Sequence, residues 1–221
     1  MANFDLEEQE QIDQLKHFWA RYGNLITWAL IVVLGGFAAW NGWNWWQRSQ
    51  SVKAAALYDE IDRAARARDA AKIEQALSDM KSQFGRTTFA AQGGLLAAQS
   101  LFEAGKGDAA KAALTWVADS ASDDSYQAVA RLRLAAVHLE AKAYDEALKV
   151  LQAPVPESFV SLVADRRGDV FMAQGKTEEA KAEYKKAWDA MGARTEYRQL
   201  VQVKLASLGV EVTTAKAGAA Q

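Results

Sequence analysis

Hydrophobic and polar residues are distributed unevenly along this chain, and the longest uncharged stretch lies near its N-terminus. No charged residue occurs between Arg21 and Arg48. Residues 22–47 would extend about 39 Å as an α-helix at about 1.5 Å per residue, whereas the hydrocarbon core of a bilayer is about 30 Å thick. The centre of the stretch, residues 25–34, is strongly apolar. The pattern therefore predicts a transmembrane helix over residues 22–47.

A cleaved secretory signal is the first alternative for this stretch. Such a signal has a basic start, an apolar core of about 7–15 residues and small residues at the cleavage site. Here the preceding segment is acidic, and the apolar stretch ends in a tryptophan-rich segment, residues 40–46. Tryptophan prefers the headgroup level, because its ring is apolar while its N–H seeks a partner. The stretch is therefore interpreted as a retained anchor.

The charges beside the predicted span leave its orientation open. Lys16 and Arg21 precede it, and Arg48 and Lys53 follow it, so the positive-inside count is even. Residues 1–21 before the span form an amphipathic tail, in which Asp5 is placed to cap a helix and Glu8 to complete a capping box. This tail either lies on the headgroups or docks on a partner.

Helical periodicity continues after the span, and short breaks divide it into pieces. The span helix is expected to run on to about Ala67. No segment alternates with period two for long enough to predict a strand. The predicted helices are 71–84, 88–104, 108–120, 125–141, 144–152, 158–174, 177–191 and 195–208. The fold class is therefore all-α, with a domain of helices over residues 48–209 and a flexible tail over residues 210–221.

Three of the break-then-helix segments superpose and indicate an internal repeat. The aligned alanines Ala110, Ala147 and Ala180 lie 37 and 33 residues apart, close to the tetratricopeptide period of about 34. A small residue stands twelve positions before each alanine, and small residues at both points allow the two helices of a hairpin to cross closely. The three earlier residues are Ala98, Ala135 and Gly168. The sequence thus predicts a tetratricopeptide-like solenoid of helical hairpins, closed by a capping helix; a generic helical bundle is the alternative.

Composition and charge exclude several functions. Residues 49–221 hold 23 basic and 23 acidic residues, and the basic ones are scattered, so nucleic acid is not an expected ligand. The chain has no cysteine, which excludes disulfides and thiolate chemistry. His138 falls at a packing position, and Asp165 and Asp169 share one helix face without a second acidic pair. We expect no catalytic residue, no cofactor and no metal site.

Binding features are better represented. The first helix of a tetratricopeptide hairpin lines the concave surface, and its exposed inner positions here form a mixed apolar and polar groove suited to a polypeptide. The alternative is that several of these residues pack against a neighbouring hairpin. The predicted groove residues are Gln92, Leu95, Gln99, Phe102, Leu132, Leu139, Leu162, Asp165, Asp169 and Met172. In the span, Gly35, Ala39 and Gly42 share a face of small residues that suits close packing of membrane helices.

The order of these elements resembles the YfgM family, the ancillary proteins of the Sec translocon in the inner membrane of Gram-negative bacteria. The likeness runs from the acidic segment 4–10 through the span and hairpins to the closing helix at 202–205. It implies a cytoplasmic N-terminus and a periplasmic repeat domain. It also implies association with the SecYEG translocon and a PpiD-like periplasmic chaperone, and a link to envelope stress. The tryptophan-rich end of the span and the alanine-heavy repeats differ in detail from the family.

Three hypotheses about function follow. The first is a non-enzymatic adaptor that is anchored in the lipid bilayer. It would hold a periplasmic chaperone, and emerging or unfolded polypeptides, beside the translocon. The second is a cytosol-facing tetratricopeptide scaffold for a membrane signalling or division complex, which the even flanking charge allows. The third is an anchored hydrolase or transferase, against which the lack of a polar constellation argues.

Overall fold

A computed structural model describes residues 6–192 and 196–212, and all secondary structure in these ranges is α-helical. The predicted cap at Asp5 and the predicted flexible residues 213–221 lie outside them. The helices follow one another in the order α1 (Leu6–Arg66), α2 (Ala70–Phe84), α3 (Thr88–Glu103), α4 (Gly107–Ser120), α5 (Asp124–Glu140), α6 (Tyr144–Val150), α7 (Glu157–Ala173), α8 (Thr177–Ala190) and α9 (Tyr197–Ser207). The predicted helices agree with these bounds to within about two residues, and the all-α fold class is confirmed.

Helix α1 contains the apolar stretch. Within the described residues, one helical segment, Lys16–Arg66, is long and apolar enough to cross a membrane, and its most apolar window has a mean hydropathy of 1.7. Only 6% of that window is buried by the rest of the protein. Large apolar side chains such as Leu25, Val32 and Trp45 are 69%, 69% and 73% exposed. This part of α1 therefore has the length, composition and exposure that a membrane span requires.

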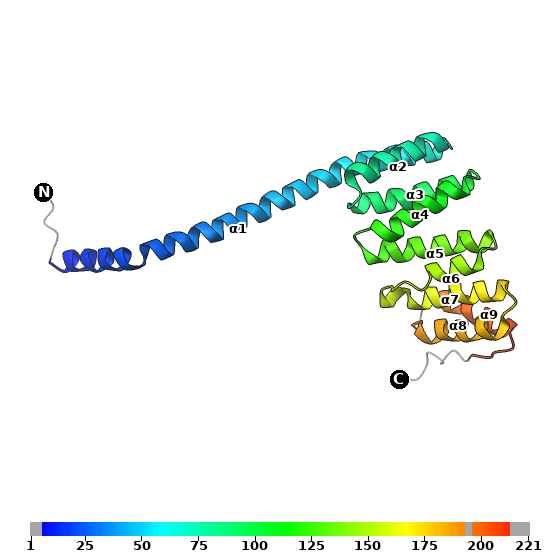
Figure 1. The fold of residues 1–221 in the computed structure, drawn as a ribbon. Helices are drawn as coiled ribbons and strands as arrows, with labels where there is room; N and C mark the ends of the chain where they lie inside the picture. Colours follow the sequence, from blue (N-terminus) through cyan, green and yellow to red (C-terminus); the bar gives the residue numbers. More distant parts are fainter. Residues whose placement is uncertain (1–5, 193–195, 213–221) are drawn as a thin grey trace. The chain divides into compact units, whose positions relative to one another are not determined.

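The chain divides into two compact units, Met1–Gln50 and Ser51–Gln221. In the second unit, the helices stack as antiparallel hairpins in chain order (Figure 1). The pairs are α3 with α4, α5 with α6, and α7 with α8, and α9 packs on the last pair. Side chains cap several helices: Asp69 accepts a hydrogen bond from the Lys72 N–H, and Thr87 accepts one from the Ala90 N–H. The breaks predicted from the sequence thus separate the helices of a solenoid.

One turn recurs at the end of the first helix of each hairpin. A residue with positive φ follows each of these helices, and the next N–H donates a hydrogen bond to a carbonyl five residues back, as in a Schellman motif. The bonds from Lys106 to Leu101, from Ala143 to His138 and from Lys176 to Phe171 measure 2.8, 2.8 and 2.9 Å between N and O. The turn residues are Arg68, Gly105, Lys142, Gly175 and Gly209, at intervals of 37, 37, 33 and 34 residues.

The spacing of these turns reveals a hairpin that the sequence repeat did not. Arg68 places the end of α1 and the whole of α2 in register with the three predicted repeats. Ile61 and Ile73, both at most 1% exposed, occupy the positions where the other repeats have alanine or glycine. Large isoleucines at these points hid the unit from a search for small residues. Gly209 ends α9 in the same turn, so the predicted capping helix occupies the place of a further first helix.

The small residues of the repeat lie where the two helices of each hairpin cross. Ala98, Ala110, Ala135, Ala147 and Ala180 are all at most 2% exposed. At Gly168 the space is smaller still, because a Cβ atom there would lie 2.4 Å from Cε1 of Tyr184 on the paired helix. Leu114, Leu151 and Tyr184 stand four positions after the aligned alanines Ala110, Ala147 and Ala180, and each is 3% exposed. The predicted packing rule is therefore confirmed in all three repeats.

Candidate functional site

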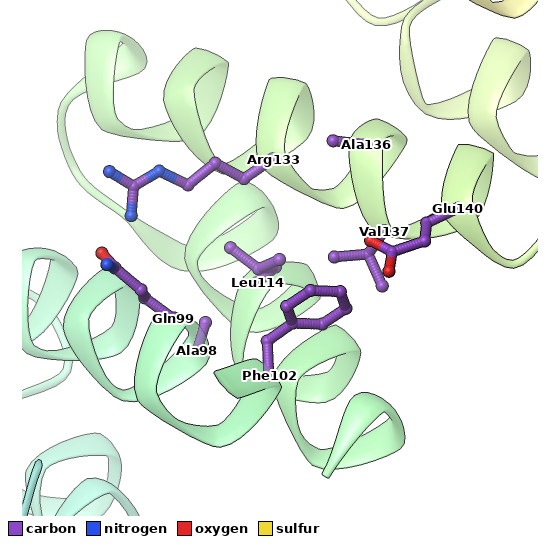
Figure 2. A pocket seen from close by; sticks show the side chains of 8 residues that line it. All are labelled: Ala98, Gln99, Phe102, Leu114, Arg133, Ala136, Val137 and Glu140. Atoms are coloured by element: carbon purple, nitrogen blue, oxygen red, sulfur yellow. The ribbon is translucent and has the colours of Figure 1, made fainter. Parts of the chain in front are cut away.

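A cavity of about 230 Å³ lies between α3, α4 and α5, the helices of two consecutive hairpins (Figure 2). Its lining is mostly apolar. Phe102 is 36% exposed, while Leu114 and Ala98 belong to the core and are 3% and 2% exposed. The apolar lining residues are Ala98, Phe102, Leu114, Ala136 and Val137. The cavity is thus formed by the core of one hairpin where it meets the first helix of the next.

Polar side chains border this cavity at its two ends, and the two charged ones among them have opposite charges. Arg133 and Gln99 lie at one end and Glu140 at the other (Figure 2). One terminal nitrogen of Arg133 donates to the Leu95 carbonyl over 3.3 Å, and the Gln99 amide donates to Glu103 over 3.0 Å. A guanidinium has five N–H donors, so Arg133 retains donors for an anion after this contact. The cavity therefore combines an apolar floor with a cationic end and an anionic end.

The structure places the predicted groove residues in several environments. Gln99 and Phe102 line the cavity, and Met172 on α7 is 38% exposed. Leu132 and Leu139 are half-buried and pack against the core around Ala135 and Val170. Two further residues are also half-buried: Leu162, and Gln92, whose amide donates to the Tyr126 hydroxyl over 2.7 Å. Binding of a partner by this predicted groove stays a prediction.

Two predicted groove residues are not exposed, and for them the expectation was wrong. Leu95 is 8% exposed because it belongs to the large core formed by the first hairpins. Asp165 is 1% exposed because side chains of α9 cover it. A capping helix in the position of a further first helix necessarily covers the same face of α7. Asp169, one turn later, is half-buried by the same contacts.

Asp165 and Asp169 are bound together by Lys204. The Lys204 ammonium lies 2.8 and 2.9 Å from the two carboxylate oxygens of Asp165 and 2.6 Å from Oδ1 of Asp169. The Tyr197 hydroxyl donates to Asp165 over 2.6 Å, and the Tyr184 hydroxyl donates to Asp169 over 2.8 Å. Burial first, and these hydrogen bonds to carboxylates second, raise the pKa of Tyr184 and Tyr197 well above the ordinary value. The arrangement is a satisfied structural network that fastens α9 to the last hairpin.

The register of the turns relates the cavity between α3 and α5 to the equivalent place between α7 and α9. Gln99 and Asp169 both stand six positions before their turn residue, and Val137 and Lys204 both stand five before theirs. Between α7 and α9 these two positions carry the Asp169–Lys204 ion pair. Between α3 and α5 they carry an amide and a valine, which cannot pair. The space there stays open.

Sequence reasoning missed the α5 side of this cavity. Arg133, Ala136, Val137 and Glu140 were not among the predicted groove residues, because the prediction counted from the small residues along each helix separately. The signal that would have found them is the register of the left-handed turns. The repeat alignment already places Lys142 opposite Gly105 and Gly175, and the same register applied across neighbouring helices leads to the α5 residues.

The predicted small-residue face of the span is exposed along α1. Gly35, Ala39 and Gly42 are all exposed, and a Cβ atom at Gly35 or Gly42 would meet nothing within 4 Å. Among the described residues of the first unit, none covers this face. Its use as a lateral interface stays a prediction.

Among the described residues outside the network around Lys204, His138 has a shifted pKa and no carboxylate hydrogen-bonded to it. His138 is half-buried, and burial first and the nearby Lys111 second lower its pKa, against the opposing effect of Glu146. In the part of the chain that the structure describes, no group of three His, Cys, Asp or Glu side chains is arranged to hold a metal ion.

Comparison with known proteins identifies the family. The tetratricopeptide repeat-like domain family has a model that matches residues 16–210. A protein of Neisseria gonorrhoeae named "Ancillary SecYEG translocon subunit" is 35% identical over 92% of this chain and 98% of its own length. Proteins of the same name from Haemophilus influenzae and Escherichia coli are 29% and 27% identical over 93% and 92% of this chain, and over 99% and 97% of their own lengths. The chain therefore belongs to the YfgM family of ancillary SecYEG translocon subunits, and its repeats are tetratricopeptide-like.

Proposed function

We propose that this protein is a membrane-anchored, non-catalytic adaptor that associates with the SecYEG translocon. The observation that carries the proposal is the alignment of relatives named for this role over more than nine tenths of the chain, apolar helix and hairpins included. Residues 22–47 of α1 anchor the chain in the bacterial inner membrane. The helical hairpins then serve to bind other proteins.

Co-purification tests the association. The full-length chain, extracted from native membranes in mild detergent, is expected to bring down SecYEG subunits. An unrelated single-span membrane protein with the same tag controls for chance recovery of membrane proteins. A chain in which residues 22–47 are replaced by an unrelated span tests what the anchor contributes. Recovery of the subunits by neither chain contradicts the proposal. Equal recovery by both places the association in the repeat domain.

The proposed orientation has residues 1–21 in the cytoplasm and the repeat domain in the periplasm. The family resemblance supports it, and the flanking charges are neutral on the point, since two basic residues stand on each side of residues 22–47. Protease added to intact spheroplasts is expected to remove the repeat domain. A repeat domain that is degraded only after lysis would instead favour the cytosol-facing scaffold.

The proposed partners of the repeat domain are a PpiD-like periplasmic chaperone and emerging polypeptides. Exposed apolar side chains on first helices, Phe102 on α3 and Met172 on α7, support polypeptide binding. A photo-crosslinking amino acid at position 102 or 172 is expected to capture such partners in living cells. The control position is Glu179 on α8, which is exposed on the second helix of its hairpin. Equal capture at all three positions would contradict the assignment.

A further inference from the structure

We propose that the cavity between α3, α4 and α5 binds one apolar side chain of an extended polypeptide that carries an acidic residue on one side of it and a basic residue on the other. The inference rests on the proposed function, since it names the kind of segment that the repeat domain would bind. The size of the cavity, its lining and the charges at its two ends support it.

The apolar part of the cavity selects the anchor. Its volume of about 230 Å³ is below the about 300–1,000 Å³ typical of small-molecule sites, and its floor is Phe102, Leu114 and Val137. An aromatic or branched aliphatic side chain on this floor buries apolar surface, which is the main source of its affinity. Phe102 is the most exposed apolar member of the floor and contributes to it directly from α3.

The charged ends select the flanking residues. Arg133 and Glu140 lie seven residues apart on α5, which corresponds to a rise of about 10 Å at about 1.5 Å per residue. An extended chain rises about 3.3 Å per residue and directs alternate side chains to the same face. Residues i, i+2 and i+4 therefore face the cavity together and cover about 13 Å. An acidic residue opposite Arg133 and a basic residue opposite Glu140 complete the match.

The position of the cavity in the repeat register supports its use as a binding site. The equivalent register between α7 and α9 is occupied by the Asp169–Lys204 ion pair at 2.6 Å, and there the chain itself supplies an acid and a base. Between α3 and α5 the same two positions carry Gln99 and Val137, which are uncharged, and the charges of Arg133 and Glu140 stand at the cavity ends. In the proposed complex, the ligand supplies the acidic residue that pairs with Arg133 and the basic residue that pairs with Glu140.

Fluorescence anisotropy with the full-length chain in detergent tests this proposal. The probe is a labelled nonapeptide with the central sequence Asp-Ser-Phe-Ser-Lys, compared with a version in which Phe is replaced by Ser and with versions that carry two acidic or two basic flanking residues. The first peptide is expected to bind about tenfold more tightly than the version without Phe. Equal binding of all four peptides overturns the proposal. Tighter binding of the same three side chains on an alanine-rich helical peptide overturns the extended geometry.

Substitutions in the cavity make the test specific. Phe102→Ala removes part of the floor, and Ala136→Phe fills the cavity from a half-buried position on α5, so each is expected to weaken binding about tenfold. Leu200→Ala is the matched control, because Leu200 is an exposed apolar residue like Phe102 but lies on α9, outside the predicted groove. Circular dichroism verifies the fold of each variant. Undiminished binding by both cavity variants overturns the proposal.

Reversal of one charge is expected to create tighter binding of a different peptide, a result that damage to the fold does not produce. Arg133→Glu makes both ends acidic and is expected to shift preference to the peptide with two basic residues. Glu140→Lys is expected to shift preference to the peptide with two acidic residues. Lys185→Glu on α8 changes the net charge as much as Arg133→Glu, away from the cavity, and is expected to leave the preference unchanged. If Lys185→Glu shifts the preference as Arg133→Glu does, the cavity is not the site.

Recovery of SecYEG subunits with the same variants separates the two proposals. Cavity variants that lose the peptide but retain the translocon support the site and the proposed function together. Peptide binding that responds to the cavity variants, in a wild-type chain that recovers no translocon, contradicts the proposed function alone. Translocon recovery with peptide binding indifferent to the cavity overturns this inference alone.

Discussion

The Lys204 ammonium lies 2.8 Å from Oδ1 of Asp165, a residue that is 1% exposed. The two residues stand 39 positions apart, on α9 and α7, and their contact covers the face of α7 on which a groove was expected. Because Tyr197, also on α9, donates to the same carboxylate, the last helix is fastened at both its ends. The C-terminal hairpin is therefore closed by a charged contact between helices.

Removal of the Lys204 charge is expected to destabilise the repeat domain strongly. Lys204→Met leaves Asp165 buried without its cation, and loss of one partner of a buried ion pair costs about 3–5 kcal/mol. Since Lys204 is about one fifth exposed, the lower end of this range is expected for the free energy of unfolding in urea. Lys185→Met, an exposed lysine on α8, is the control and is expected to change stability by less than about 0.5 kcal/mol. Similar effects of the two substitutions would contradict the structural role of the contact.

Alkaline pH is expected to weaken the same region. The pKa of Tyr197 is raised in the folded state, so the folded chain retains a proton that the unfolded chain releases above about pH 10. This contribution to stability is fully present below pH 10 and falls as pH rises toward the folded pKa, with a slope of at most about 1.4 kcal/mol per pH unit. Tyr197→Phe removes this titration. The difference in unfolding free energy between wild type and variant, followed from pH 8 to 11, is expected to shrink above pH 10; a constant difference would refute the expectation.

The crossing of α7 and α8 is expected to reject even one added methyl group. In Gly168→Ala the new Cβ atom would lie 2.4 Å from the Tyr184 ring, so the helices must separate, and overpacking of this kind costs about 1–3 kcal/mol. Gly107→Ala is the matched control, because a Cβ atom there meets nothing within 4 Å and alanine favours a helix. Thermal unfolding is expected to give a lower Tm for the first variant and an equal or higher Tm for the second.

The left-handed turn at Lys142 predicts a stabilising substitution. Lys142 has a φ of 59°, whereas the equivalent residues in the neighbouring repeats are Gly105 and Gly175. A non-glycine residue in this region costs about 1–2 kcal/mol, so Lys142→Gly is expected to raise the free energy of unfolding by about 1 kcal/mol. Gly105→Ala is expected to lower it by a similar amount. A destabilised Lys142→Gly variant would mean that its side chain contributes more than the turn costs.

The small-residue face of the span predicts a position-specific effect on association in membranes. Gly35→Leu is expected to reduce co-purification of translocon subunits severalfold, since a large side chain keeps membrane helices apart. Gly36→Leu is the control: a Cβ atom at Gly36 also meets nothing within 4 Å, but the residue is rotated to another side of α1. Both variants are expected to retain the fold of the repeat domain. Equal loss with both would exclude a specific face.

The sequence by itself determined the helices, their breaks and the crossing points of three hairpins. These features are local: helical periodicity, glycine at turns and paired small residues each carry their own signal. Ala98 with Ala110, and Gly168 with Ala180, are buried as the spacing predicted. The sequence likewise predicts the apolar helix over residues 22–47, because the signal for a membrane span lies in composition and length alone.

Only the tertiary structure decided which polar residues are exposed. Asp165 and Asp169 share a helix face in the sequence, but Lys204 and Tyr197 approach them from a helix more than thirty positions away, and no periodicity encodes that contact. The hairpin of α1 and α2 was missed for a related reason. Its crossing positions carry the large residues Ile61 and Ile73, whereas the other hairpins have small residues there. The cavity beside Phe102 depends in the same way on α5, a helix of the next hairpin that supplies half of its lining. Helices form from near neighbours in the chain, whereas burial is set by whatever the folded chain brings alongside.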